Sequence, residues 1–388
     1  MLLDVVFTAG KRKDILMNTM MVGHKAFLNH VTSQMNKNPL VQFGNQLASN
    51  AAADSVSLSL STSQGKTTSP TKVAIVGGAG NVGASLAMSL VEQSLCNEVA
   101  LYDMQGNAAK GKALDLNQAA AVNGSSTFVT GGDNYDVIKD ANIVVVTAGS
   151  PRQPGQSRDD LLLKSAGVIQ TVCENIKQYA PDATIIMVSN PLDAMTQLAQ
   201  KVTGFPPNRV FGMAGVLDSG RFKALIAEQL KVSPNDVQAM VLGGHGDTMV
   251  PILSNTTVSG VPVEQLIDKP TLDKIIDRVK NAGAEIVNLA GRSSYYGPGA
   301  AIAKMIKAVL KGETTVAPVC ANVDGQYGLN NLYVGVPVRL GRTGVEQVLN
   351  IKMNPDELAA FQASVDSCKA NIAKIPYLNP AANTAPVS

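Results

Sequence analysis

The chain has 388 residues, of which 45% are hydrophobic and 16% are charged, so it is long enough for about two globular domains. A membrane span needs roughly 18 consecutive apolar residues, and because the sequence contains no such run we expect a soluble protein without a membrane partner. The formal charge is only +2, and nothing in residues 72–388 resembles the basic face that nucleic-acid binding requires, so we expect no nucleic-acid partner.

Residues 1–71 differ in composition from the rest and are expected to form an N-terminal extension outside the folded body. They hold six Lys/Arg against three acids, none of them a glutamate, and they end in a Ser/Thr-rich stretch. Apolar residues recur at helical spacing at Leu16, Met20, Phe27, Val31 and Met35. This pattern is typical of a transit peptide, so we expect import into an organelle, with the mitochondrion as the first choice. The alternatives are a disordered tail on a cytoplasmic protein and another organelle.

A glycine-rich motif follows the first apolar run of the body. Residues 73–76 read as a buried strand, and they lead through Gly78-x-Gly80-x-x-Gly83 into a helical stretch. This spacing allows a tight turn, close approach of the backbone to a diphosphate, and binding of that diphosphate at the helix N-terminus. Asp103 ends a second strand twenty residues after Gly83, where a carboxylate binds the ribose hydroxyls of NAD and repels the extra phosphate of NADP. The alternative is an aspartate that caps the next helix.

Strands and helices continue to alternate after this motif, which indicates a doubly wound parallel sheet, the NAD-binding Rossmann arrangement. We expect residues 210–213 to close this sheet. The other expected strands are residues 98–103, 127–130, 143–147 and 184–188, and the expected helices are residues 84–93, 108–118, 135–139 and 159–179.

Polar residues follow two of these strands at the edge where such sheets bind ligands. Residues 148–158 combine two prolines and two glycines with Arg152 and Arg158, which indicates a mobile loop that closes over an anion. Asn190 ends the strand 184–188, and its amide could bond a substrate oxygen. A solvated loop with surface arginines and an ordinary Asn-Pro turn are the alternatives.

His245 is the only histidine after residue 71, since the other two are His24 and His30. An imidazole titrates near neutral pH, and the surrounding Gly243, Gly244 and Gly246 suit a sharp loop that a ligand can approach. Upstream, Asp218 and Arg221 are three residues apart and so share a helix face. The alternatives are a lone histidine in a turn after an apolar strand at residues 237–242, and a surface ion pair.

Together these segments resemble the lactate/malate dehydrogenase family, and most closely its malate dehydrogenases of the lactate-dehydrogenase-like type. The resemblance runs from residue 72 to about residue 375. It rests on five motifs in the family's order: the 78–83 fingerprint with Asp103, Pro151-Arg152 to Arg158-Asp159-Asp160-Leu161, Ser189-Asn190-Pro191, Leu217-Asp218 to Arg221-Phe222, and Gly244-His245-Gly246-Asp247.

The resemblance implies a role for each of these residues. His245 would be the acid/base on the substrate oxygen, and Asp218 would orient its ring and stabilise its cation. Arg221 would grip the C1 carboxylate, and Arg158 would polarise the carbonyl. Asn190 and Ser294 complete the expected substrate site. The expected cofactor site comprises Gly78, Gly80, Asn81, Val82, Gly83, Asp103, Thr147, Ala148, Gly149, Val188 and Asn190.

Arg152 bears on the choice of substrate. At this loop position the family's malate enzymes present an arginine and its lactate enzymes an uncharged side chain. A second substrate carboxylate would pair with Arg152, whereas pyruvate would leave the cation unpaired, at a cost of roughly 2–5 kcal/mol. We therefore expect an NAD-dependent malate dehydrogenase acting on a dicarboxylate. The alternatives are a lactate or other 2-hydroxyacid dehydrogenase and a non-catalytic NAD-binding scaffold.

The expected domains are the extension 1–71, the Rossmann domain 72–213, an α+β catalytic domain 214–378 and a tail 379–388. The second domain should hold helices at residues 271–289, 299–310 and 355–373 and a strand pair at 316–322 and 333–340. Family members are homo-oligomers, as tetramers or dimers. The four cysteines are widely spread and lack Cys-x-x-Cys spacing, so we expect a reducing compartment with neither disulfides nor a bound metal.

Overall fold

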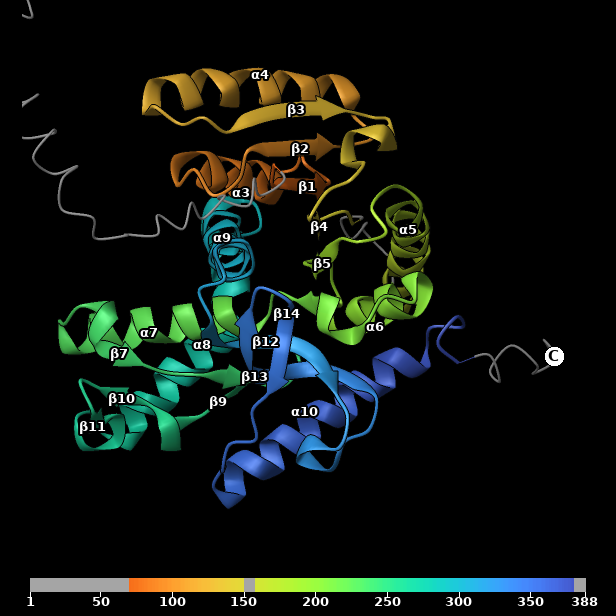
Figure 1. Ribbon diagram of the computed structural model, residues 1–388. Helices are drawn as coiled ribbons and strands as arrows, with labels where there is room; N and C mark the ends of the chain where they lie inside the picture. The colour runs from red at the N-terminus through yellow and green to blue at the C-terminus, as the bar shows by residue number, and fades with distance from the viewer. Residues whose placement is uncertain (1–69, 150–157, 380–388) are drawn as a thin grey trace, which may run out of the picture. The chain divides into compact units, whose positions relative to one another are not determined.

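The computed structural model describes residues 70–149 and 158–379, so the N-terminal extension, apart from its last two residues, lies outside the described part (Figure 1). The same holds for the loop with Arg152. The described residues all belong to one compact unit, Thr68–Ser388.

The expected parallel sheet is present and has the strand order β3-β2-β1-β4-β5-β6, the Rossmann order. Each strand is short and mostly buried on both faces, as continuous apolar runs require. The pairing is in register, with Val73 of β1 opposite Val99 of β2 and Ile143 of β4. The bounds are β1 Lys72–Val76, β2 Glu98–Tyr102, β3 Phe128–Gly132, β4 Ile143–Val146, β5 Thr184–Met187 and β6 Val210–Gly212.

The prediction that residues 210–213 close this sheet is wrong. β12 (Thr315–Val323) pairs antiparallel with β6, with Cys320 opposite Gly212. β13 (Leu332–Gly341) and β14 (Gly344–Val348) extend the sheet further, so that it has nine strands. The physical reason is that β6 would otherwise leave unpaired backbone groups at an edge, and the hairpin from the second half of the chain satisfies them.

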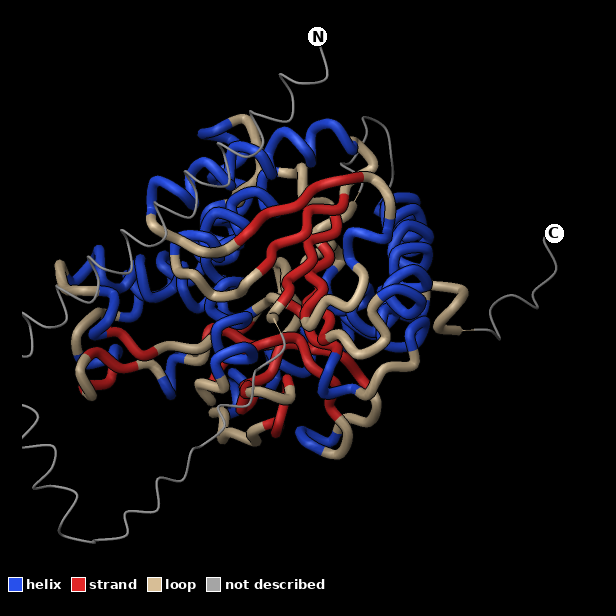
Figure 2. The backbone as a smooth tube through the Cα atoms, turned by 45° about the horizontal axis from the view of Figure 1, so that its top comes forward, coloured by secondary structure: helices blue, strands red, loops and turns tan. Residues whose placement is uncertain are grey.

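Two layers of helices cover the parallel sheet (Figures 1 and 2). One face packs α3 (Asn81–Glu92) and α4 (Gly106–Asn123) against alternate side chains such as Val73 and Val99, and α9 (Tyr296–Lys311) packs on α3 in the same cluster. The other face packs α5 (Arg158–Tyr179) and α6 (Leu192–Thr203). Residues 135–138 form a 3₁₀ helix rather than an α-helix. The sequence interpretation missed α6, although Leu192, Met195, Leu198 and Val202 recur at helical spacing.

The second half of the chain adds α7 (Gly215–Leu230), α8 (Lys269–Ala290) and α10 (Pro355–Ala373). The expected strand 237–242 is divided between two small sheets: β7 (Val237–Gln238) pairs with β10 (Thr257–Val258), and β8 (Val241–Leu242) with β9 (Val250–Pro251). β11 (Val261–Pro262) completes the first of them. The division follows burial, because Val237 packs in the α7/α8 cluster whereas Leu242 joins the main core.

Gly299 joins the two halves of the chain. It lies in the first turns of α9, where a Cβ would stand 2.7 Å from Ser85 Oγ and 3.0 Å from the Leu86 nitrogen of α3. Glycine therefore lets α9 pack directly on the helix that follows the glycine motif. This close approach explains the glycine at position 299.

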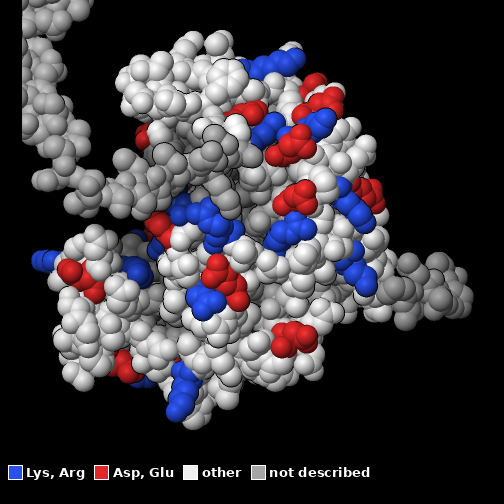
Figure 3. Space-filling view, viewed as in Figure 1, with Lys and Arg blue, Asp and Glu red and all other residues white. Residues whose placement is uncertain are grey.

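Surface charge, cysteines and metal-ligating side chains of the described residues can be compared with the expectations from the sequence. On the face drawn in Figure 3, cationic and anionic side chains are interspersed rather than segregated. All four cysteines are buried and none forms a disulfide. Within residues 70–149 and 158–379, no cluster of His, Cys, Asp and Glu could hold a metal ion, and no helix is long and apolar enough to cross a membrane.

Candidate active site

The glycine motif forms the turn between β1 and α3. Gly77 adopts φ +86°, and the backbone nitrogens of Gly77 and Gly78 both donate to the Tyr102 carbonyl at 2.9 Å. A Cβ on Gly83 would lie 2.7 Å from the Gly77 oxygen, so Gly83 is needed for close packing of helix on turn. Sequence reasoning assigned no role to Gly77, although it is the residue of the motif that needs a left-handed backbone.

The N-terminus of α3 is open to an anion. Gly80 caps the helix without a side-chain hydrogen bond, and the nitrogens of Asn81, Val82 and Gly83 lie in its first turn, where no intrahelical acceptor exists. Unsatisfied N–H groups together with the helix dipole favour a phosphate at this place. The donors present therefore fit the diphosphate of a dinucleotide.

Asp103 stands beside this turn, immediately after β2. Its Oδ2 accepts from the Ala79 nitrogen and its Oδ1 from the Gln105 nitrogen, both at 3.0 Å. The carboxylate therefore links the glycine turn to the end of β2. Each oxygen can accept more than one hydrogen bond, so the same carboxylate can also receive ribose hydroxyls.

A cleft of about 890 Å³ opens at the carboxyl ends of β4 and β5, between the sheet and the second half of the chain. Its size is in the range of cofactor and ligand sites. Nine predicted site residues line it: Val82, Thr147, Ala148, Gly149, Val188, Asn190, Arg221, His245 and Ser294. Thr147 is held by hydrogen bonds from its Oγ1 to the carbonyls of Val76 and Gly77, at 3.0 and 3.2 Å.

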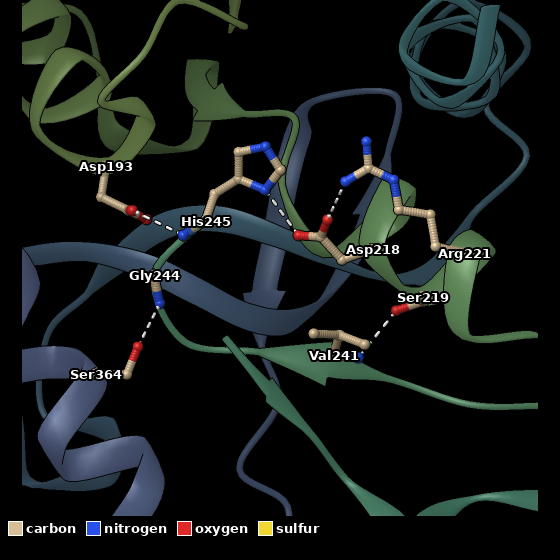
Figure 4. Close-up of polar contacts among 8 residues, drawn as sticks. All are labelled: Asp193, Asp218, Ser219, Arg221, Val241, Gly244, His245 and Ser364. Carbon is tan, nitrogen blue, oxygen red and sulfur yellow. Dashed lines mark hydrogen bonds and ion pairs between the residues drawn. The ribbon is translucent and has the colours of Figure 1, made fainter. Parts of the chain in front are cut away.

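Two of the residues that line this cleft, His245 and Arg221, contact the same carboxylate, that of Asp218, as Figure 4 shows. The Nδ1 atom of His245 lies 2.7 Å from Asp218 Oδ2, and the Arg221 guanidinium donates to Asp218 Oδ1 at 3.2 Å. The Asp218 side chain is only 2% exposed, whereas those of His245 and Arg221 are 15% and 18% exposed. The buried carboxylate of Asp218 thus orients two partly accessible groups, the imidazole of His245 and the guanidinium of Arg221, and the surface-pair alternative does not apply.

The surroundings of His245 favour its protonated form. Burial is the largest single influence and lowers its pKa, but Asp218 through its charge and hydrogen bond, together with the charge of Asp193, outweighs burial and the repulsion from Arg221. The pKa therefore lies above its ordinary value of 6.5. The contact with Asp218 engages Nδ1, which leaves Nε2 to exchange a proton with a ligand.

The loop that carries His245 is held from three elements. Gly243 pairs with Gly335 of β13 through two backbone hydrogen bonds of 2.8 and 3.1 Å. Ser364 Oγ of α10 accepts from the Gly244 nitrogen at 2.8 Å. Asp193 Oδ2 of α6 accepts from the His245 nitrogen at 3.1 Å. Sequence reasoning gave no role to Ser364 or Asp193, because both are far from the loop in sequence.

α8 forms the remaining wall of the cleft, with Lys280, Asn281, Ala284 and Val287 facing it. The spacing of these residues fits one face of a helix, but nothing in the sequence indicated that this face lines a site. Arg152 lies outside the described residues. Arg158 begins α5, one residue earlier than the expected helix, and its side chain is not described.

The chain matches two family models in succession. One is described as lactate/malate dehydrogenase, NAD binding domain, and matches residues 71–212. The other is described as lactate/malate dehydrogenase, alpha/beta C-terminal domain, and matches residues 215–377.

Individual relatives agree with these matches. The malate dehydrogenase of Salinibacter ruber is 48% identical over 301 residues, which cover 78% of this chain and 96% of that protein. A crystal structure of malate dehydrogenase from the same organism superposes with a TM-score of 0.76 at 45% identity, covering 80% of this chain and 99% of that one. The lactate dehydrogenase of Cryptosporidium parvum, complexed with lactic acid and nicotinamide adenine dinucleotide, has a TM-score of 0.76 at 36% identity and covers 82% and 99%.

Proposed function

Because this chain belongs to the lactate/malate dehydrogenase family, we propose that it is an NAD-dependent malate dehydrogenase, which interconverts malate and oxaloacetate. The observation that carries the proposal is the buried Asp218 holding both His245 and Arg221 inside a cleft next to the glycine turn. A non-catalytic scaffold would have no use for a buried carboxylate that orients an acid/base and an anion-binding group together.

The cofactor is NAD, which when bound supplies or accepts the hydride at the substrate carbon. The open N–H groups at the start of α3 would hold its diphosphate, and Asp103 its adenosine ribose. Thr147, Ala148, Gly149, Val188 and Asn190, at the ends of β4 and β5, would line the nicotinamide side.

The chain's own groups would position the substrate and move the proton. Arg221 donates to Asp218 through one nitrogen, and its remaining donors are free to grip the C1 carboxylate in a bidentate pair. In reduction, protonated His245 gives its Nε2 proton to the carbonyl oxygen as the hydride arrives, and in oxidation the neutral ring takes the proton back. Asn190 and Ser294 would bond substrate oxygens, and Arg158 would stabilise charge on the carbonyl oxygen.

The choice of malate over lactate rests on the relatives and on Arg152. The fold does not decide it, because structures of a malate and a lactate dehydrogenase superpose equally well. Oxidation of NADH, followed by its absorbance with oxaloacetate and pyruvate side by side, tests the proposal. We expect oxaloacetate to be reduced with much the higher kcat/KM. Faster reduction of pyruvate would indicate a lactate dehydrogenase. Absence of turnover with both keto acids would indicate a non-catalytic NAD-binding scaffold.

Asp103 should set the preference for NADH over NADPH. If Asp103 holds the adenosine ribose, its carboxylate would lie where the extra phosphate of NADPH has to bind, so like charges would repel. We expect Asp103→Ser to lower the ratio of kcat/KM for NADH to kcat/KM for NADPH. The control Asp115→Ser removes an exposed carboxylate of α4 and should leave this ratio unchanged. Equal efficiency of the parent enzyme with both cofactors would refute this role of Asp103.

The raised pKa of His245 predicts the pH dependence of the reaction. Reduction needs the protonated ring, so its kcat/KM should stay level up to this pKa and fall tenfold for each pH unit above it, while oxidation should weaken as the pH falls through it. Asp218→Asn removes the main influence that raises the pKa and leaves burial, so the alkaline limb of reduction should move to lower pH. If the alkaline limb of Asp218→Asn stays at the pH of the parent, a group other than His245 controls the pH dependence of reduction.

Three further assignments belong to this proposal. The domain division stays at 72–213 and 214–378, and the chain would assemble as a homo-oligomer, a tetramer or dimer, which sedimentation tests. Residues 1–71 would direct import into the mitochondrion. A reporter fused to residues 1–71 tests this targeting, and a reporter that stays diffuse in the cytosol would contradict it.

A further inference from the structure

Asp193 approaches the catalytic histidine from the side opposite Asp218, as Figure 4 shows. It lies in the first turn of α6, is only 7% exposed, and accepts the backbone N–H of His245 on Oδ2 at 3.1 Å. Asp218 comes from α7 and holds the ring of the same residue. His245 is therefore held by two buried carboxyl groups, one on its backbone and one on its imidazole.

A charged side chain such as that of Asp193 is not needed merely to accept a hydrogen bond from a backbone N–H. Among the described residues its Oδ1 forms no hydrogen bond of ordinary geometry, and only the weakly donating thiols of Cys320 and Cys368 lie beside the carboxyl group, although burial of a poorly paired polar atom costs free energy. One residue earlier in the loop, the Gly244 nitrogen is held at 2.8 Å by an uncharged hydroxyl, that of Ser364. A serine would thus have sufficed as an anchor. The use of a buried carboxyl points to a role for its charge.

We propose that Asp193 is a positioning residue for the reaction, which fixes the backbone of His245 through its N–H and uses its negative charge to favour the protonated imidazole. The proposal rests on the proposed function, because it deepens the role of His245 as acid/base. It assigns separate tasks to the two carboxyl groups: Asp218 selects the ring orientation and tautomer, and Asp193 sets the position and charge of the loop behind the ring.

Among the described residues, the charged groups that face His245 come from three helices and from its own loop, whereas β13 and α10 contribute uncharged contacts. Asp218 and Arg221 face it from α7 and Asp193 from α6, while Lys280 of α8 and Asp247 of the loop line the same cleft. The thiols of Cys320 on β12 and Cys368 on α10 lie beside Asp193. The pKa of Asp193 lies above its ordinary value, because burial raises it by more than the His245 N–H and the Cys320 thiol, which stabilise the ionised form, lower it. The anion in turn helps to raise the pKa of His245.

The two side chains should therefore titrate as a coupled pair. Loss of the negative charge at Asp193 makes imidazolium less favourable, so reduction should lose activity at a lower pH. A residue that only anchored the loop would change the rate at every pH alike. The shape of the pH profile thus separates a charge effect from a structural one.

The test compares kcat/KM for oxaloacetate against pH in the full-length parent, Asp193→Asn, Asp193→Ser and Ser364→Ala. Both Asp193 variants remove the charge and keep an acceptor, and we expect their alkaline limb to move down by about one pH unit. The ratio of variant to parent kcat/KM should then fall about tenfold from the acidic plateau to the alkaline end. Ser364→Ala removes an uncharged anchor from the same loop, so its ratio should be constant across the range.

A second measurement reads the histidine without turnover. In the full-length chain carrying His24→Gln and His30→Gln, His245 is the only imidazole, and its ring signals can be followed by NMR as the pH changes. Adding Asp193→Asn should lower the midpoint by the same amount as in the kinetics. The proposal would be overturned if the parent and the Asp193 variants gave superimposable NMR titrations and pH profiles of kcat/KM, or if both Asp193 variants failed to fold. A parent without oxaloacetate turnover would instead contradict the proposed function.

Discussion

Replacement of His245 with asparagine is expected to lower turnover of oxaloacetate by roughly two to four orders of magnitude, which is the usual contribution of a general acid. Asparagine can contact Asp218 but cannot exchange a proton near neutral pH. The cleft, the glycine turn and Asp103 are untouched by the change, so binding of NADH should remain. Stopped-flow absorbance gives the turnover, and fluorescence of bound NADH gives its affinity.

The chain offers a matched control for this variant. His30→Asn makes the same substitution in the N-terminal extension, which is proposed to be a targeting segment separate from the catalytic domains, and should leave both turnover and NADH affinity unchanged. If His245→Asn keeps near-normal turnover, the proton comes from another group and the proposed mechanism is wrong. If both turnover and NADH binding disappear, the variant has lost its fold and Asp218→Asn becomes the better probe.

Replacement of Arg152 with glutamine should change the substrate preference. It removes the cation proposed to pair with the distal carboxylate and leaves Arg221 and Arg158 to serve the part that oxaloacetate and pyruvate share. Oxaloacetate should lose most of its kcat/KM, whereas pyruvate no longer leaves an arginine unpaired and should gain. A closed bidentate ion pair contributes a few kcal/mol, so the ratio of the two kcat/KM values should move by roughly two to four orders of magnitude.

This ratio is measured at saturating NADH in parent and variant. Arg339→Gln is a suitable control, because Arg339 lies on β13 with its side chain half exposed and paired to Glu346, and it is not among the residues that line the cleft. The control should leave the ratio unchanged. A movement of less than tenfold in Arg152→Gln would mean that this residue does not read the second carboxylate, and the malate assignment would then rest on the relatives alone.

Local signals were sufficient for the first half of the fold. The glycine motif and the apolar strands depend on short-range turn geometry and on burial of a continuous strand, and each lies within a few residues of the feature it specifies. Asp103 was identified by its position at the end of the next strand, at a fixed separation from the motif. The helix-face spacing of Asp218 and Arg221 likewise predicted their contact. These residues could be identified without knowing where the chain goes next.

Local signals were insufficient where two distant segments share one surface. The extension of the sheet by β12 depends on a free edge at β6 and a hairpin about a hundred residues later. The strand predicted at residues 237–242 is divided because its two ends are buried in different clusters. Nothing within either segment records which partner will cover it.

By itself, the sequence determined the family of this protein and the candidate residues for its reaction. They are the single histidine after residue 71, the glycine motif with Asp103 at the expected distance, and three arginines in the family's motif order, Arg152, Arg158 and Arg221. Only the tertiary structure showed which further groups, beyond Asp218, hold the loop of that histidine. Asp193 and Ser364 lie 52 residues before His245 and 120 residues after Gly244, respectively, and reach the loop from separate helices. The reason is physical, because the charge and hydrogen bonds that set a proton affinity act through space and not along the chain.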